Sequence, residues 1–435
     1  MPLDSNQQNT LNQASRSAIS QVMPKLEGYW IKESWLSDHN PYKKNSVDQI
    51  RMDNRNGQIS DHTQLAEYVA ASAIVHCFDG WSYLGRALEA EMAGDPDAAR
   101  HLGYYAELRA AMSVLAGDGI GVFHNIHIIV ITPQKCLLLP YETTHAFVWD
   151  ALEFWANSPA GRDTLSLAIR PGGLPLREWL EQFSAGSDFI AREWLRQWGL
   201  DLSLLTKDRD ARNLASYRPT TFTSPGPRLI GDTMEAILRF WEICEPGAVG
   251  GFPVLDRHLL RRSLALVIDR DDLQAKNLYE NQLNMMLNAL DPKELPPNQW
   301  AEFLKYENLQ HIHQIIQDAN AQDDLYHPEH SKQVLARATL LLRVATGSSA
   351  DLLSEVGPTV KEDLAFWWSS AAVRRRLWSE DNEPESFIDL WQDVDEAIDS
   401  VDQWPQDYYT LWSNYAREAA ILATTERAFL WGLEL

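Results

Sequence analysis

The sequence has few cysteines, and they do not form a metal-binding or disulfide pattern. Cys77, Cys136 and Cys244 are far apart in the chain, and no Cys-x-x-Cys pair occurs. An odd number of isolated cysteines argues against a disulfide framework and against a cysteine-rich zinc site. We therefore expect free, buried thiols, as in proteins of the reducing cytoplasm.

Long apolar runs and common catalytic motifs are also missing. No run approaches the roughly 18 apolar residues needed to cross a bilayer, and the polar N-terminus lacks the layout of a signal peptide. The sequence contains no Gly-x-Ser-x-Gly, no phosphate loop ending in Gly-Lys-Ser/Thr, and no Gly-x-Gly-x-x-Gly after a strand. We expect a soluble, cytoplasmic protein that needs no cofactor and no membrane. Catalysis stays undecided, with a non-catalytic role favoured.

Basic charge is scarce. The chain has 38 Lys and Arg against 61 Asp and Glu, a formal net charge of -23. Such a field disfavours non-specific binding to nucleic acid. From Trp378 to Leu435 there are 14 acidic residues against 2 arginines, so this part carries -12. It predicts an interface for a protein with a basic surface, through Asp389, Asp393, Asp395, Glu396, Asp399 and Asp402.

Tryptophan is abundant, with 17 residues in a chain of 435. Its large side chain buries much apolar surface and brings an N–H that needs a partner. Packing in the core is the expected role for most of them, and several could anchor a protein interface instead.

Helical periodicity dominates the chain and predicts a mainly α-helical fold, as a multi-helix array or bundle. From Asp61 onward, apolar residues recur at three- and four-residue spacing as far as Met92. Gly80 and Gly85 lie inside this stripe, which indicates either a break or a close approach by another helix.

One small β-hairpin or three-stranded element is expected near residues 120–170. Asp95 and Pro96 begin a helix that ends at Gly117-Asp118-Gly119. Two β-rich runs follow, VFHNIHIIVI and KCLLLP, separated by the turn TPQ. A further helix should start after Thr143 or Thr144, and the run TLSLAI at 164–169 could add a third strand.

Turn signals suggest a division into three parts. Residues 1–60 read as a loop-rich N-terminal segment because of Asn40-Pro41 and Asn56-Gly57. Residues 61–217 form a helical domain with the hairpin, and residues 229–435 form an all-helical domain with the acidic part. The Pro/Ser/Thr-rich stretch 218–228 is the predicted boundary.

The densest polar group consists of structural histidines or forms an anion or ligand pocket. Its members are His124, His127, Glu142, Thr144 and His145. Histidines and a carboxylate can bind a metal, but residues three apart on a strand point to opposite faces. His145 would lie in the first turn of a helix, where backbone N–H groups attract anions. We therefore predict no metal.

Two basic clusters interrupt the acidic background. Arg257, Arg261 and Arg262 form one, and Arg374 and Arg375 belong to the other. Salt bridges to nearby acids are one interpretation. Contacts to a phosphate or to an acidic partner are the other.

One helix carries a resemblance to a known family. GYYAELRAAMSVLAGDG, residues 103–119, resembles the paired-tyrosine helix of HEPN-type helical domains. Members of that family that cut RNA use an Arg, four to six intervening residues, and a His. Here only Arg55 and His62 fit that spacing, across the Asn56-Gly57 turn, so the catalytic motif does not transfer. The stretches 104–123 and 144–155 also resemble uncharacterised helical accessory proteins of bacterial defence operons.

These observations support three hypotheses. The first is a non-catalytic interaction or regulatory subunit of a bacterial cytoplasmic assembly, with anti-phage defence as its setting. The second is a HEPN-like helical ribonuclease or nucleic-acid-processing component. The third is a sensor that binds a small molecule or anion.

Overall fold

A computed structural model describes residues 3–183, 189–217, 230–270, 276–322, 327, 329–379, 381–400 and 407–434. The mainly α-helical prediction is confirmed. Within these residues there are 22 α-helices and a single three-stranded antiparallel sheet. None of the described helices is both long enough and apolar enough to span a bilayer.

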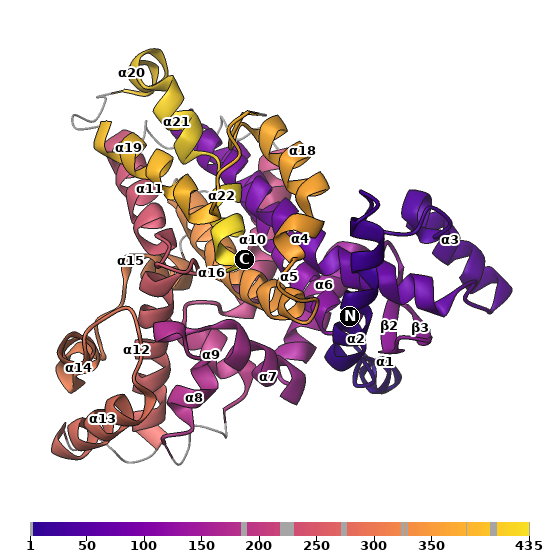
Figure 1. The fold of residues 1–435 in the computed structure, drawn as a ribbon, viewed down its shortest axis with the longest axis horizontal. Coiled ribbons are helices and arrows are strands. Elements are labelled where there is room, and N and C mark those ends of the chain that lie inside the picture. The colour runs from indigo at the N-terminus through magenta and orange to yellow at the C-terminus, as the bar shows by residue number, and fades with distance from the viewer. Residues whose placement is uncertain are drawn as a thin grey trace.

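The helices and the small sheet follow one another along the chain as Figure 1 shows. In chain order they are α1 (Ser5–Leu11), α2 (Arg16–Trp30), α3 (Tyr42–Asn56), α4 (His62–Met92), α5 (Pro96–Gly117), α6 (Thr144–Ala156), α7 (Pro159–Ala168), α8 (Leu176–Leu180), α9 (Ala191–Gln197), α10 (Leu202–Tyr217), α11 (Ile230–Cys244), α12 (Pro253–Arg270), α13 (Lys276–Leu290), α14 (Pro297–Leu304), α15 (Gln314–Asn320), α16 (His330–Ser354), α17 (Val360–Asp363), α18 (Ala365–Arg375), α19 (Leu390–Ser400), α20 (Tyr408–Asn414), α21 (Ala416–Leu422) and α22 (Glu426–Gly432).

Three long helices, α4, α5 and α16, form the centre of the molecule (Figure 1). Most residues of α16 are buried around its whole circumference, as in a helix enclosed by other elements. It packs against α4 and α5, so elements on both sides of the predicted boundary share one hydrophobic core. The stretch 218–228 lies outside the described residues, and the three-part division stays a prediction.

The hairpin prediction is confirmed. Strands β2 (Ile126–Thr132) and β3 (Lys135–Pro140) pair antiparallel through the predicted turn. The third strand is β1 (Ile120–Gly121), which pairs with β2. The strand prediction for 164–169 is wrong, because most of that run belongs to α7. Ser158 caps α7 and Pro159 occupies its first turn, and both favour a helix start.

The prediction of a loop-rich N-terminal segment is also wrong, since α1, α2 and α3 occupy most of residues 5–56. Ser15 caps α2 by accepting the amide of Ala18. Asn56-Gly57 is a helix end and not an isolated turn, because Gly57 takes the left-handed conformation (φ 65°) that terminates α3. The α2 residues buried against the core recur at helical spacing, and they are Ile19, Val22, Met23 and Leu26.

The two glycines inside α4 mark close approaches by neighbouring elements. A Cβ at Gly80 would lie 2.7 Å from a methyl of Leu342 in α16. At Gly85 it would lie 2.2 Å from the backbone oxygen of Ala423, just after α21. The second of the two alternatives drawn from the sequence is therefore confirmed, and α4 runs unbroken.

Gly85→Ala is expected to lower the free energy of unfolding by about 1–3 kcal/mol, because the neighbour is backbone and cannot rotate away. Gly28→Ala is the matched control, since a Cβ there meets no atom within 4 Å. The control should gain about 0.5–1 kcal/mol from helix propensity. Urea unfolding of both variants measures the difference, and equal stabilities would contradict the close packing at Gly85.

Candidate functional site

The predicted histidine group does not converge into one pocket. His124 and Glu142 are exposed, whereas His127 is fully buried in β2. His145 is half-buried in the first turn of α6, as expected. Thr144 donates its hydroxyl to the carbonyl of Phe123 at 2.7 Å, which ties α6 to the segment before β2. The pocket as drawn from the sequence stays a prediction, and its members occupy different environments.

His127 has a structural environment. Its ring stacks on Phe147 at 3.6 Å between centroids. Its Nδ1 accepts the amide of Phe123 at 3.2 Å, so the proton sits on Nε2, which faces the carbonyl of Glu142 at 3.3 Å. Burial lowers the pKa of His127 to about 3. The imidazole is therefore neutral near pH 7.

His145 contacts residues that the sequence did not single out as a site. Its Nδ1 lies 2.9 Å from the Tyr104 hydroxyl of α5, and its Nε2 lies 3.4 Å from the Arg212 guanidinium of α10. The Arg212 guanidinium carbon is 5.3 Å and 5.4 Å from the ring centroids of Tyr104 and Tyr105. The paired tyrosines of α5 thus face an arginine and a histidine. We call Tyr104, Tyr105, His145 and Arg212 the Arg212 cluster.

A buried group of charged side chains lies next to the Arg212 cluster, on α5, α10 and α16. Arg337 of α16 binds Asp208 of α10 with both ends of its guanidinium, at 2.6 and 2.7 Å. Glu107 of α5 is fully buried beside them, and burial together with the Asp208 charge raises its pKa well above the ordinary value. Glu107 also lies 3.8 Å from Arg337, and His330 lies 3.5 Å from Asp208. Asp208 and Glu107 are therefore both engaged with Arg337, not with the Arg212 cluster.

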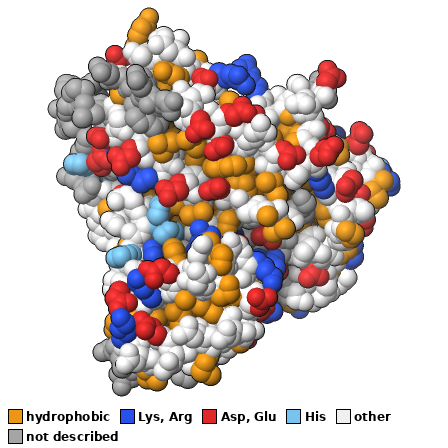
Figure 2. Space-filling view, turned by 60° about the vertical axis from the view of Figure 1, so that its left-hand side comes forward, with side chains coloured by type: hydrophobic (Ala, Val, Ile, Leu, Met, Phe, Trp, Pro, Cys, Tyr) orange, Lys and Arg blue, Asp and Glu red, His pale blue; other side chains and the backbone are white. Residues whose placement is uncertain are grey.

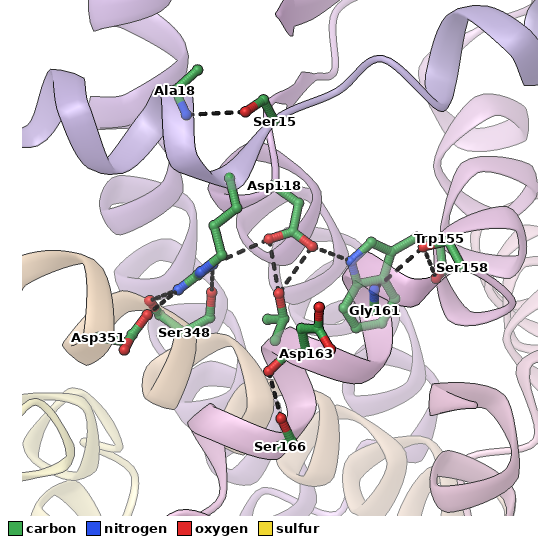
Figure 3. Close-up of polar contacts among 12 residues, drawn as sticks. Ser15, Ala18, Asp118, Trp155, Ser158, Gly161, Asp163, Ser166, Ser348 and Asp351 are labelled. Carbon is green, nitrogen blue, oxygen red and sulfur yellow. Dashed lines mark hydrogen bonds and ion pairs between the residues drawn. The ribbon is translucent and has the colours of Figure 1, made fainter. Parts of the chain in front are cut away.

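Asp118, at the end of α5, is the centre of a second polar group (Figure 3). Its carboxylate pairs with Arg16 of α2 at 3.1 Å and accepts the Thr164 hydroxyl of α7 at 2.9 Å and the Trp155 indole of α6. Arg16 continues to Asp351 of α16 at 2.8 Å. Burial raises the pKa of Asp118, and the cation of Arg16 opposes that shift. All these partners are internal, so the group joins five helices.

The predicted basic clusters are largely directed at the protein itself. Arg257 lies 3.5 Å from Glu294. Arg261 contacts Nδ1 of His258 at 2.8 Å, and Arg262 contacts Oε1 of Gln197 at 2.8 Å. In the second cluster Arg375 pairs with Glu426 at 3.4 Å, whereas Arg374 is exposed at the end of α18. A role in phosphate binding stays a prediction for all five arginines.

Three of the six predicted acidic residues form an exposed acidic surface on α19. Asp389 accepts the amide of Ser386, and Asp393 pairs with the buried Arg427 at 2.7 Å, so both stabilise the fold. Asp402 lies outside the described residues. Three exposed carboxylates remain on α19, and no described Lys or Arg lies within ion-pair distance of them: Asp395, Glu396 and Asp399.

A small apolar groove lies between α4, α11, α15 and α16. Side chains such as Ile237, Phe240, Ile315 and Leu335 line it. The ring centroids of Trp241 in α11 and Trp391 in α19 are 6.4 Å apart. Helix α11 therefore contacts both the groove and α19. Figure 2 turns this side of the molecule forward and shows hydrophobic side chains gathered among acidic ones.

Arg55 and His62, the pair that fits the ribonuclease spacing, lie in different environments. Arg55 is exposed at the end of α3, while Nδ1 of His62 accepts the amide of Cys136 at 3.1 Å. Across the described part of the chain, no three His, Cys, Asp or Glu side chains form a group that could hold a metal ion.

Stability should fall as the pH drops from about 6.5 towards 3, because His127 must stay neutral in the folded state. Its folded pKa lies below the unfolded value of about 6.5, so the unfolded chain takes up the proton first. Each unit of pH in this window costs up to about 1.4 kcal/mol for one such group. His127→Gln should flatten the slope of unfolding free energy against pH, measured by urea titration. His124→Gln, at an exposed position, is the control and should leave the slope unchanged.

Comparison of the chain with protein-family models, with curated proteins and with solved structures finds no match.

Proposed function

We propose that this protein is a non-catalytic interaction subunit that binds a protein partner with a basic surface. Two observations carry the proposal: the apolar groove that α11 helps to line, and the exposed carboxylates Asp395, Glu396 and Asp399 on α19, which α11 contacts through Trp241 and Trp391. A bacterial cytoplasmic assembly, with anti-phage defence as its setting, is the context that the sequence resemblance favours.

The two features have complementary physical roles in binding. An apolar groove accepts one or two large side chains of a partner, and such anchors contribute most of the affinity at many interfaces. Unpaired carboxylates beside the groove attract a basic surface, which raises the association rate and selects against acidic partners. Asp393 supports this arrangement indirectly, because its pair with Arg427 fixes the orientation of α19.

The charge part of the proposal is tested by reversing the three exposed acids. Asp395→Lys, Glu396→Lys and Asp399→Lys together should slow association with the native partner by roughly tenfold or more and remove most of its salt dependence. The partner is first identified by pull-down and mass spectrometry, and then purified for kinetic measurement. Glu33→Lys, Asp38→Lys and Asp48→Lys form a control with the same change in net charge. Equal effects of the two triple variants would reject a specific role for α19.

The groove is tested separately. Ala236→Trp, from a half-buried position in its lining, should fill the groove and speed dissociation of the same partner by at least tenfold. Ser17→Trp, at an exposed position on α2, is the control for adding an indole to a helix surface. Unchanged dissociation of the Ala236→Trp variant would show that the partner binds elsewhere.

A further inference from the structure

Arg212 is a buried cation without a counter-ion. Its relative exposure is 7%, and among the described residues no carboxylate lies within ion-pair distance of it. Within the described part of the chain its Nε has no hydrogen-bond partner, and one terminal nitrogen lies 3.4 Å from Nε2 of His145. The guanidinium also lies over the rings of Tyr104 and Tyr105. An arginine held in this way costs stability unless an anion compensates its charge.

The acids nearest to Arg212 cannot supply that compensation. Asp208, one turn earlier on α10, gives both of its oxygens to Arg337. Glu107 is fully buried, burial raises its pKa, and its Oε1 lies 3.8 Å from the same Arg337 guanidinium. The protein therefore leaves a net positive charge at Arg212, and Arg209 adds to it from the preceding turn, paired only with the half-exposed Asp210 at 3.4 Å.

Positive charge and the N-terminus of α6 meet at Arg212. His145 lies in the first turn of α6, where Thr143 makes no side-chain cap and the helix N-terminus favours negative charge. Since an arginine can only donate, Nε2 of His145 accepts from Arg212, and its Nδ1 proton goes to Tyr104. On the other side, the ring of His101 lies 5.1 Å from Tyr105, and its Nδ1 is 2.7 Å from the exposed Ser216 hydroxyl.

We propose that Arg212, with Arg209 and the first turn of α6, binds the phosphate group of a phosphate monoester. A dianion matches two arginines one turn apart on α10, and a guanidinium provides the fork of donors that phosphate oxygens accept. The half-buried rings of Tyr105 and His101 border the site and would contact the remainder of the ligand. This site lies on α5, α6 and α10, so it is independent of the partner surface on α19.

The test uses the full chain and three probes: inorganic phosphate, glycerol 3-phosphate and adenosine monophosphate, each titrated calorimetrically against sodium chloride of equal ionic strength. We expect saturable binding of at least one probe, weakened tenfold or more by Arg212→Met, since a charged hydrogen-bonded contact is lost. Arg417→Met, which removes an exposed arginine on α21, should bind as the wild type does.

The probes also separate the sources of the phosphate group. Tighter binding of adenosine monophosphate identifies an aromatic monoester, tighter binding of glycerol 3-phosphate an aliphatic one, and equal binding of all three identifies phosphate itself. If Arg212→Met does not fold, Arg209→Met takes its place, with an expected weakening of several-fold. The proposal is overturned if no probe binds the wild type saturably, or if the arginine variant tested binds like the wild type.

Discussion

Two arginines inside α16 fix the arrangement of the rest of the molecule. Arg337 and Arg343 are almost fully buried, and each meets a carboxylate from a different helix, Asp208 of α10 or Asp256 of α12. An unpaired charge in such a place would cost several kcal/mol, so any packing of α16 that separates these pairs is strongly disfavoured. Asp256 also accepts the amide of Arg170 at 2.9 Å, which brings the segment after α7 to the same point.

Buried tryptophans stabilise this arrangement by the apolar surface that they bury and by hydrogen bonds from their indole N–H groups. The indole of Trp81 in α4 donates to Thr346 of α16 at 2.8 Å, and that of Trp431 in α22 donates to the carbonyl of Cys244 in α11 at 3.0 Å. Trp198 of α9 reaches the carbonyl of Leu259 in α12 at 3.1 Å. Each of these three rings therefore joins two elements by packing and by hydrogen bonds from its indole N–H. Core packing, the main role expected from composition, accounts for these side chains.

Charge is distributed so that the two proposed surfaces have opposite character. Buried ion pairs such as Arg337–Asp208 and Arg343–Asp256 neutralise charges in the core. Among the described residues, three carboxylates of α19 and the guanidinium of Arg212 have no ion-pair partner. The long helices α4, α5 and α16 pack both sets around one core.

Local signals in the sequence determined the secondary structure wherever caps, turns and periodicity are strong. Asp95-Pro96, Gly117-Asp118-Gly119 and the hairpin turn act within a few residues of the features they set, so the helix and strands around them could be predicted. The helices before residue 60 carry caps and periodicity as well, such as Ser15 and the buried face of α2. The turn residues Asn40-Pro41 and Asn56-Gly57 suggest loops instead, because turn residues also occur at the ends of helices.

Only the tertiary structure decided which charges are paired. Asp208 and Arg337 are 129 positions apart, far beyond the range of any local sequence pattern. The residues next to Arg212 in the sequence likewise do not indicate that Asp208 already pairs with another arginine. His145 was expected near an anion because of its place in a helix, whereas its partners Tyr104 and Arg212 come from two other helices. Pairing depends on which side chains the packed core brings within a few ångströms, and that depends on the whole chain.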